Sequence, residues 1–282
     1  MIKIISDSTC DLSKDLLEKY DISILPLHVI LGENDYLDGV SITPDEIYEW
    51  ADANKTTPKT SAPSIEEAAK VFKPFIELGD EIICFSVSKE MSASSNVMRL
   101  AAESLDAEDK VFVVDSANLS TGVGLLVIEA AVMASQGMKA ADIVAKLEEL
   151  KPLVRASFIV DTLTYLHRGG RCSAVAALAG GVLKLHPMII VENGKMAVGK
   201  KYRGKINISI PAYAKELEGA LLNAKKERVF ITHSGCDESI VNEVRTYLER
   251  LNYFDEILTT RAGAVISSHC GYGTLGVLFI SK

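Results

Sequence analysis

The sequence lacks the residue patterns that mark several common catalytic and metal sites. It has no G-x-x-x-x-G-K-[ST] loop for nucleotide phosphates, no G-x-S-x-G turn for a nucleophilic serine and no H-E-x-x-H zinc motif. The five cysteines form no C-x-x-C pair, and the five histidines show no spacing typical of metal ligands. We therefore expect no metal and no P-loop nucleotide site.

Long apolar runs and an excess of positive charge are also absent. No run of about 18 uncharged apolar residues occurs, so we expect no transmembrane segment. The N-terminal stretch "MIKIISDSTCDLS" lacks the apolar region of a signal peptide. A formal net charge of -8 argues against nucleic-acid binding, which needs a basic surface. Scattered cysteines in odd number are typical of reduced thiols, so we expect a cytoplasmic protein.

What the first half of the sequence does contain is an alternation of β-branched runs with helical patterns. Strands are predicted over residues 2–6, 22–30, 81–86, 110–115 and 155–160, and helices over 63–78, 120–137 and 138–151. Ser64 and Glu67 form a capping-box pattern at the start of the first of these helices. Such alternation predicts an α/β fold with a mostly parallel sheet covered by helices.

The second half changes pattern. Residues 188–203 read as two strands joined by Asn193-Gly194, a strong hairpin signal. A helix is predicted near 206–224, where Pro211 should lie in the first turn or break the helix, and strand, helix and strand follow over 228–261. A hairpin within an alternating pattern indicates a second α/β domain. We predict two domains, 1–156 and 157–282, with a ligand site between them.

Four polar clusters interrupt the apolar pattern: "SDSTCDLS", "TTPKTSAPS", "SVSKEMSASSN" and "TYLHRGGRCS". Hydroxyls and helix N-terminal amides suit an anion, and arginine binds carboxylate or phosphate in a bidentate manner. Three of the clusters also have a purely structural explanation: capping by Asp11 or Ser13 in the first, a serine-rich capped loop in the third, and a helix C-terminus with Arg168 and Arg171 on the surface in the fourth. Near the C-terminus, His269 precedes spaced glycines and a short β-type run, unlike a phosphate loop.

Taken together, the motifs resemble the DegV family over essentially the whole chain. The resemblance is carried by the order and spacing of "SDSTCDLS", "TSAPS", "SKEMSASSN", "VVDSANLSTGVG", "DTLTYLHRGGRCS", "KYRGK" and "HCGYGTLGVLF". It implies a two-domain α/β protein with parallel and mixed sheets that holds a long-chain fatty acid between its domains. It further implies a non-enzymatic carrier, which presents the acid to a separate ATP-using fatty acid kinase subunit that makes acyl phosphate for phospholipid synthesis.

The resemblance also assigns residues. Those matched to the carboxylate site are Thr60, Ser92, Arg171 and His269, and Arg203 in "KYRGK" matches a position that faces the kinase partner. Two positions depart from the family pattern: Ala93 stands where a glycine is common, and Tyr272 stands where proline usually separates the closing glycines. No cofactor is implied besides the bound acid, and the carrier role allows transient contact with a membrane surface.

Alternatives to a carrier stay open. The apolar residues 175–190 are either a wall of the acyl tunnel or an ordinary buried helix. Ser92 and His269, with Thr60, could also serve a hydrolase or an acyl-transfer enzyme, although no carboxylate is evident in the sequence to orient His269. A lipid sensor that regulates another protein is the third reading.

Overall fold

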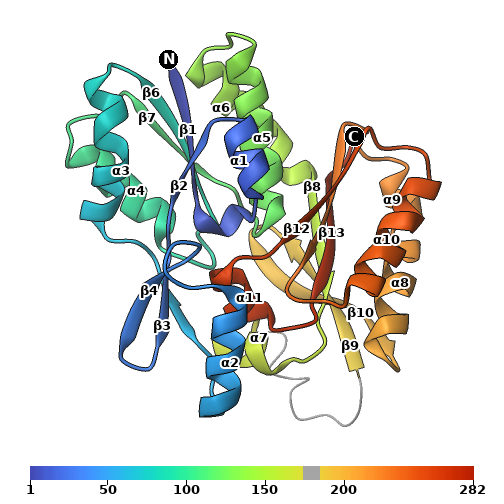
Figure 1. Cartoon of the computed structure of the whole chain (residues 1–282). Coiled ribbons are helices and arrows are strands. Elements are labelled where there is room, and N and C mark those ends of the chain that lie inside the picture. Colours follow the sequence, from blue (N-terminus) through green and yellow to red (C-terminus); the bar gives the residue numbers. More distant parts are fainter. Residues whose placement is uncertain (174–184) are drawn as a thin grey trace.

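The computed structural model describes residues 1–173 and 185–282, whose strands form three sheets (Figure 1). A four-stranded sheet has the order β2-β1-β6-β7, a three-stranded sheet has the order β4-β3-β5, and a six-stranded sheet has the order β10-β9-β8-β13-β11-β12. The first two sheets belong to the N-terminal part of the chain and the third to the C-terminal part.

The elements of the N-terminal part are β1 (Ile2–Asp7), η1 (Ser8–Cys10), α1 (Lys14–Lys19), β2 (Ile22–Leu25), β3 (His28–Leu31), β4 (Asn34–Leu37), α2 (Pro44–Asn54), β5 (Lys59–Ser61), α3 (Ile65–Glu77), β6 (Glu81–Ser86), α4 (Ser94–Glu103), β7 (Val111–Asp115), α5 (Thr121–Ser135), α6 (Ala140–Leu150) and η2 (Lys151–Leu153). The C-terminal part comprises β8 (Val154–Ile159), α7 (Thr164–Gly169), β9 (Leu185–Glu192), β10 (Lys195–Arg203), α8 (Ile206–Glu216), α9 (Glu218–Leu221), β11 (Arg228–His233), α10 (Glu238–Arg250), β12 (Glu256–Arg261), α11 (Ala264–Cys270) and β13 (Leu275–Ile280).

The four-stranded sheet is parallel throughout, as the alternating pattern predicts. Its central strands are apolar along their length because helices cover both faces, so both rows of side chains are buried. The carboxyl ends of parallel strands meet at one edge of a sheet. Here that edge holds Asp7, Ser86 and Asp115, each of which leads into a polar loop.

Helix α5 lies between the two large sheets and joins them into one core. Its hydropathy is high on all sides, and nearly every residue is buried. On one side it packs with Ile4 and Phe85 of the parallel sheet, and on the other with Ala156 and Leu278 of the six-stranded sheet. The two parts are therefore held together by a shared apolar layer.

The outer face of the six-stranded sheet is covered by α8, α9 and α10, at the right of Figure 1. Most neighbouring strands of this sheet are antiparallel, and β11 and β12 are parallel. Tyr213 of α8 is fully buried against it, where its hydroxyl contacts Ser157 of β8 and the amide of Val277. The sheet is thus mixed, as the fold class predicted from the sequence allows.

Several local predictions are confirmed. The Ser64–Glu67 capping box is present at α3, and Asn193-Gly194, both with positive φ, joins β9 to β10. Two local predictions are wrong. The single strand over 22–30 is two strands in different sheets, because Pro26 cannot donate to a ladder and the chain turns there. Pro211 lies in the middle of α8, which continues through it.

Division of the chain into domains 1–156 and 157–282 stays our proposal. Strand β8, Val154–Ile159, spans this boundary and pairs along its whole length with β13. Within the described ranges, no helix combines the length and the apolar character needed to cross a membrane. In the same ranges, no three His, Cys, Asp or Glu side chains come together as a metal site.

Candidate functional site

A hydrogen bond between Thr60 and His269 forms the centre of the candidate site. Thr60 lies on the short strand β5, which pairs with β3 through Val29, and His269 lies in the last turn of α11. The hydroxyl oxygen of Thr60 is 2.8 Å from Nε2 of His269, although the two residues are 209 positions apart. The fold therefore brings together two residues that the family resemblance assigns to one site.

His269 is neutral at physiological pH. Burial, and secondarily the nearby positive charge of Arg171, lower the pKa of its imidazole to about 4. Its Nδ1 is buried and has no hydrogen-bond partner among the described residues. Gly169 packs against that nitrogen so closely that a Cβ at this position would lie 2.4 Å from it.

These contacts indicate which nitrogen carries the proton. With the positive charge of Arg171 near the ring, an unpaired N–H at the buried Nδ1 is less favourable than an unpaired lone pair there. The proton is therefore assigned to Nε2, which donates to the hydroxyl oxygen of Thr60. The hydroxyl proton of Thr60 is then available to an acceptor in the adjoining cavity.

Ser92 belongs to the loop that follows the carboxyl end of β6. The carboxylate of Asp7 accepts the amide of Val87 at 2.8 Å and so fixes the start of this loop. The hydroxyl of Ser92 lies 2.8 Å from that of Ser94, and it accepts the amide of Ser94 at 3.3 Å. Ser92 thus sits at the first turn of α4, where backbone N–H groups add positive potential.

The two predicted arginines differ in position. Arg171 lines the same cavity as Thr60, and its guanidinium donates to the carbonyl of Gly169 at 2.8 Å, just before the left-handed C-cap Gly170 of α7. Arg171 therefore caps the C-terminal end of α7 and also lines the cavity. Arg203 ends β10, is exposed, and is not among the residues that line the cavity.

The cavity has a volume of about 280 Å³. Apolar side chains form most of its wall, and the polar lining residues include the Thr60–His269 pair. The lining residues are Thr9, Leu27, Thr60, Ser61, Ala62, Val87, Met91, Ser92, Ala93, Leu119, Arg171, Met196, Val265, Ile266, His269 and Cys270. They come from both large parts of the chain.

None of the described residues of the apolar segment 175–190, one of whose two predicted roles was the tunnel wall, lines the cavity beside Thr60. Residues 175–184 lie outside the described residues. In the rest of that segment, Met188 and Ile190 line a different cavity, of about 650 Å³, beside β8 and β9. Within the described part, the wall comes from α11, from the strands β5 and β10, from η1 and from loops.

The closing glycines allow a tight turn beneath an aromatic cluster. Gly271 and Gly273 both have a φ of 78°, and a Cβ at Gly271 would lie 2.8 Å from the ring of Tyr165. The rings of Tyr165 and Tyr272 each meet Tyr48 edge-on, with centroids 6.0 and 5.6 Å from it. Tyr272, which departs from the family pattern, therefore closes this cluster.

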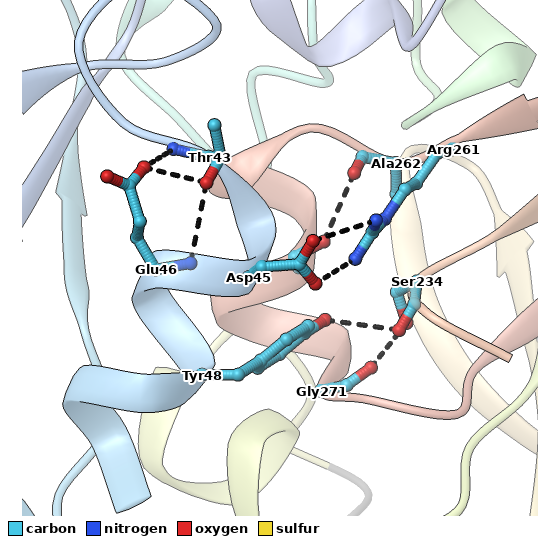
Figure 2. Close-up of polar contacts among 9 residues, drawn as sticks. Thr43, Asp45, Glu46, Tyr48, Ser234, Arg261, Ala262 and Gly271 are labelled. Atoms are coloured by element: carbon cyan, nitrogen blue, oxygen red, sulfur yellow. Dashed lines mark hydrogen bonds and ion pairs between the residues drawn. The ribbon is translucent and has the colours of Figure 1, made fainter. Parts of the chain in front are cut away.

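Figure 2 shows how α2, from the N-terminal part, contacts the C-terminal part beside this loop. The Tyr48 hydroxyl donates to the carbonyl of Ser234 at 3.3 Å, and the Ser234 hydroxyl donates to the carbonyl of Gly271. The carboxylate of Asp45 pairs with both terminal nitrogens of Arg261, one of them at 3.0 Å. The turn that follows His269 is therefore held through Ser234, and the Asp45–Arg261 pair separately joins α2 to the end of β12.

Buried aspartates are the part of the site that the sequence did not reveal. Asp7 fixes the start of the Ser92 loop, and Asp11 and Asp38 accept amides at the start of α11. The sequence suggested Asp11 as a helix cap. The helix that it contacts could not be predicted, because the amide that it accepts belongs to Gly263, 252 residues further along the chain. Asp38 carried no sequence signal.

The arrangement offers hydrogen-bond donors and an apolar cavity, without the parts of a hydrolytic triad. In such a triad a carboxylate accepts the second ring N–H of the histidine. Among the described residues, Nδ1 of His269 has no such partner. Hydroxyl donors backed by a neutral imidazole and a nearby guanidinium suit a bound carboxylate.

The chain matches a known protein family over its whole length. The family model described as "Uncharacterised protein, DegV family" matches residues 1–282. A DegV domain-containing protein of Deinococcus radiodurans is 32% identical over 277 residues, covering 98% of this chain and 97% of that protein.

Solved structures are similar over the same length. A DegV family protein from Thermus thermophilus, described by its fatty acid binding, has 31% identity and a TM-score of 0.91, with 100% of this chain and 99% of that chain covered. A stearic acid-binding protein from Eubacterium ventriosum has 34% identity and a TM-score of 0.86, with the same coverage. The chain described here belongs to the DegV family.

Proposed function

We propose that this protein binds a long-chain fatty acid, with the carboxylate at Thr60, Ser92, Arg171 and His269 and the acyl tail in the cavity of about 280 Å³. The observation that carries the proposal is the Thr60–His269 hydrogen bond at 2.8 Å, which lies in the wall of a largely apolar cavity. The proteins of similar structure that are described as binding fatty acids support the same ligand class.

In the proposed arrangement, two successive hydrogen bonds connect His269 to the acid through Thr60. Neutral His269 donates from Nε2 to Thr60, and Thr60 then donates its own proton to a carboxylate oxygen. The hydroxyl of Ser92 donates to the same carboxylate group, and Arg171 supplies positive charge nearby. Because His269 carries no charge of its own, the site binds the acid mainly through hydrogen bonds and the field of one arginine.

Burial of the tail supplies most of the affinity. A sixteen-carbon acid has about fourteen methylenes, each worth about 0.8 kcal/mol when buried, or about 11 kcal/mol before ordering costs. Desolvating the carboxylate costs several kcal/mol, and charge-assisted hydrogen bonds of about 1.5–3 kcal/mol each offset that cost. The head group therefore selects an acid over other lipids, and the tail holds it.

The finer proposal is that the protein is a carrier subunit. It presents the acid to a separate ATP-dependent fatty acid kinase subunit, which forms acyl phosphate for phospholipid synthesis. Exposed Arg203 is the proposed contact with that subunit. A cytoplasmic location and transient contact with a membrane surface belong to the same proposal.

Native mass spectrometry tests the ligand class. Delipidated protein is mixed with stearic acid or with octadecanol, which has the same tail and no carboxylate. The proposal predicts one bound acid per chain and weak uptake of the alcohol. Equal uptake of both, or uptake of neither, argues against it.

A second assay separates the carrier from an enzyme. The protein alone is incubated with acyl esters and with acyl phosphate, and free acid is measured. A carrier leaves both compounds intact, whereas turnover that is lost in Ser92→Ala supports a hydrolase.

A further inference from the structure

Helix α11 carries His269 but supplies no cap for its own first turn. It has only seven residues, and its N-cap is Gly263, which has no side chain. A helix of this length is not stable by itself. Its first amides are instead satisfied by two aspartates from the N-terminal part of the chain. The amide of Gly263 donates to Asp11 Oδ1 at 2.8 Å, and that of Ala264 donates to Asp38 Oδ1 at 2.7 Å.

The carboxylate of Asp11 and the backbone of Asp38 each make a further contact. Asp11 is 5% exposed, and its second oxygen accepts the hydroxyl of Ser120 at 2.5 Å. Asp38 is 3% exposed, and its backbone amide donates to the carbonyl of Leu27, a cavity residue, at 2.9 Å. Burial raises the pKa of each carboxyl above its usual range. Oδ2 of Asp38 has no hydrogen-bond partner among the described residues, so its carboxylate depends on the amide of Ala264 at Oδ1.

The contact between α11 and the aspartates is close. A Cβ at Gly263 would lie 3.0 and 3.1 Å from the two carboxylate oxygens of Asp38 and 3.4 Å from Oδ1 of Asp11. Gly263 has a φ of -65°, which any residue adopts, so the requirement for glycine is one of space. The helix start can therefore approach the carboxylates only because this position has no side chain.

The same helix forms one wall of the site. Val265, Ile266, His269 and Cys270 all line the cavity, and His269 lies in the last turn of α11. A helix is a rigid unit, so a displacement of its first turn is passed to its last turn. Because the hydrogen bond to Thr60 is 2.8 Å long, a shift of less than 1 Å weakens it.

We propose that Asp11 and Asp38 are positioning residues for acid binding: by holding the start of α11 against the N-terminal part of the chain, they place Nε2 of His269 at Thr60. This inference rests on the proposed fatty acid site. Neither carboxylate contacts the acid, and each acts through the helix.

The first experiment compares Asp38→Ala with Asp38→Asn in delipidated protein. Stearic acid binding is measured by titration calorimetry, and the ring nitrogens of His269 are followed by ¹⁵N NMR. We expect Asp38→Ala to weaken binding about tenfold or more. This is the effect of losing one charge-assisted hydrogen bond, here the bond from Thr60 to the acid, once His269 no longer holds the Thr60 hydroxyl. In that variant the ¹⁵N chemical shift of Nε2 should move away from the value of a hydrogen-bonded nitrogen. Asp38→Asn keeps an oxygen that accepts the amide of Ala264, so it should restore most of the affinity and the Nε2 shift.

Gly263→Ala is the second variant, in case Asp38→Ala does not fold. It keeps both carboxylates but separates them from α11, and it should weaken binding in the same direction. Asp45→Ala is the matched control, because the carboxylate of Asp45 also joins the two parts of the chain but pairs with Arg261 of β12 and not with an amide of α11. The control should bind within about twofold of the unsubstituted protein.

Two results separate the inference from the proposed function. If folded Asp38→Ala and Gly263→Ala keep both the affinity and the His269 signal, the positioning role is wrong even though the acid binds. If the unsubstituted protein binds no acid, the proposed function is wrong. The NMR signal of His269 then still decides whether Asp38 positions the helix.

Discussion

Thr60 and His269 share a hydrogen bond of 2.8 Å that connects a three-residue strand of the N-terminal part to a seven-residue helix of the C-terminal part. Neither element is long enough to be stable alone. The bond therefore depends on how the two parts of the chain pack, through α5 and through the aspartates that hold α11. The polar end of the cavity exists only in the assembled fold.

The hydroxyl of Thr60 can be removed with little change in shape by Thr60→Val. The account predicts that binding of stearic acid weakens about 10- to 100-fold, since one charge-assisted hydrogen bond is lost. Titration calorimetry at pH 7 measures this loss. Thr56→Val, at an exposed position of the same loop, serves as the control and should bind as the unsubstituted protein does. Equal affinity of both variants would contradict the role of Thr60.

Ser92 should act on the same carboxylate as Thr60. In a double-mutant cycle with Thr60→Val and Ser92→Ala, the loss in the double variant should differ from the sum of the two single losses, because the two hydroxyls share one ligand group. Additive losses would mean that the two side chains bind independently.

Gly169→Ala tests whether the packing behind His269 matters. A Cβ at this position would lie 2.4 Å from Nδ1 of His269, so the ring must move away and its bond to Thr60 must lengthen. We expect weaker acid binding and a changed ¹⁵N signal of His269. Gly219→Ala in α9, where the added Cβ meets nothing within 4 Å, is the control. Unchanged binding by Gly169→Ala would show that the ring has more room than the structure gives it.

The lowered pKa of His269 makes stability depend on pH. Burial, followed by Arg171, lowers this pKa from 6.5 to about 4, so between these values the unfolded chain binds a proton that the folded chain does not. The contribution of His269 to the free energy of unfolding is therefore complete above about pH 6.5 and falls as the pH falls towards 4. His269→Asn removes this dependence.

Urea unfolding of delipidated protein at pH 4.5 and at pH 7 measures the effect. The free energy of unfolding of the unsubstituted protein, minus that of His269→Asn, should be larger at pH 7. The comparison must be a difference, because burial raises the pKa of Asp7 to about 6, which gives a slope of opposite sign over the same range. An equal difference in the free energy of unfolding at both pH values would contradict the lowered pKa and mean that His269 is accessible to solvent.

Tyr213 provides a test of the fold away from the site. Its buried hydroxyl donates to the carbonyl of Ser157 at 2.7 Å and accepts the amide of Val277 at 3.0 Å. Tyr213→Phe leaves these groups unpaired, so the free energy of unfolding should fall by about 1–3 kcal/mol. Urea unfolding measures the change, and acid binding should not be affected. An unchanged stability would mean that water replaces the hydroxyl.

The sequence predicted the elements whose signals are local. Strands β1, β6 and β7 are short runs rich in β-branched and other apolar residues, and α3 begins at a capping box, so each could be recognised without knowledge of its neighbours. Helix α11 was not recognised as a helix, because Ser267 and Ser268 are buried and their hydroxyls donate to carbonyls of the preceding turn, which removes any amphipathic pattern.

The same reasoning explains what could be known of the site. Thr60, Ser92, Arg171 and His269 were named through the family resemblance, and the structure brings all four to one cavity. Their roles stay predictions until a ligand is observed. Asp38 could not be found from the sequence, since its partner Ala264 is 226 residues away and no local pattern encodes that contact.

A crystal structure of the protein with stearic acid tests the central claim most directly. The account predicts the carboxylate within about 3 Å of the hydroxyls of Thr60 and Ser92, with the tail against Leu119 and Ile266. A carboxylate bound elsewhere, or a cavity that stays empty at saturating acid, would contradict it.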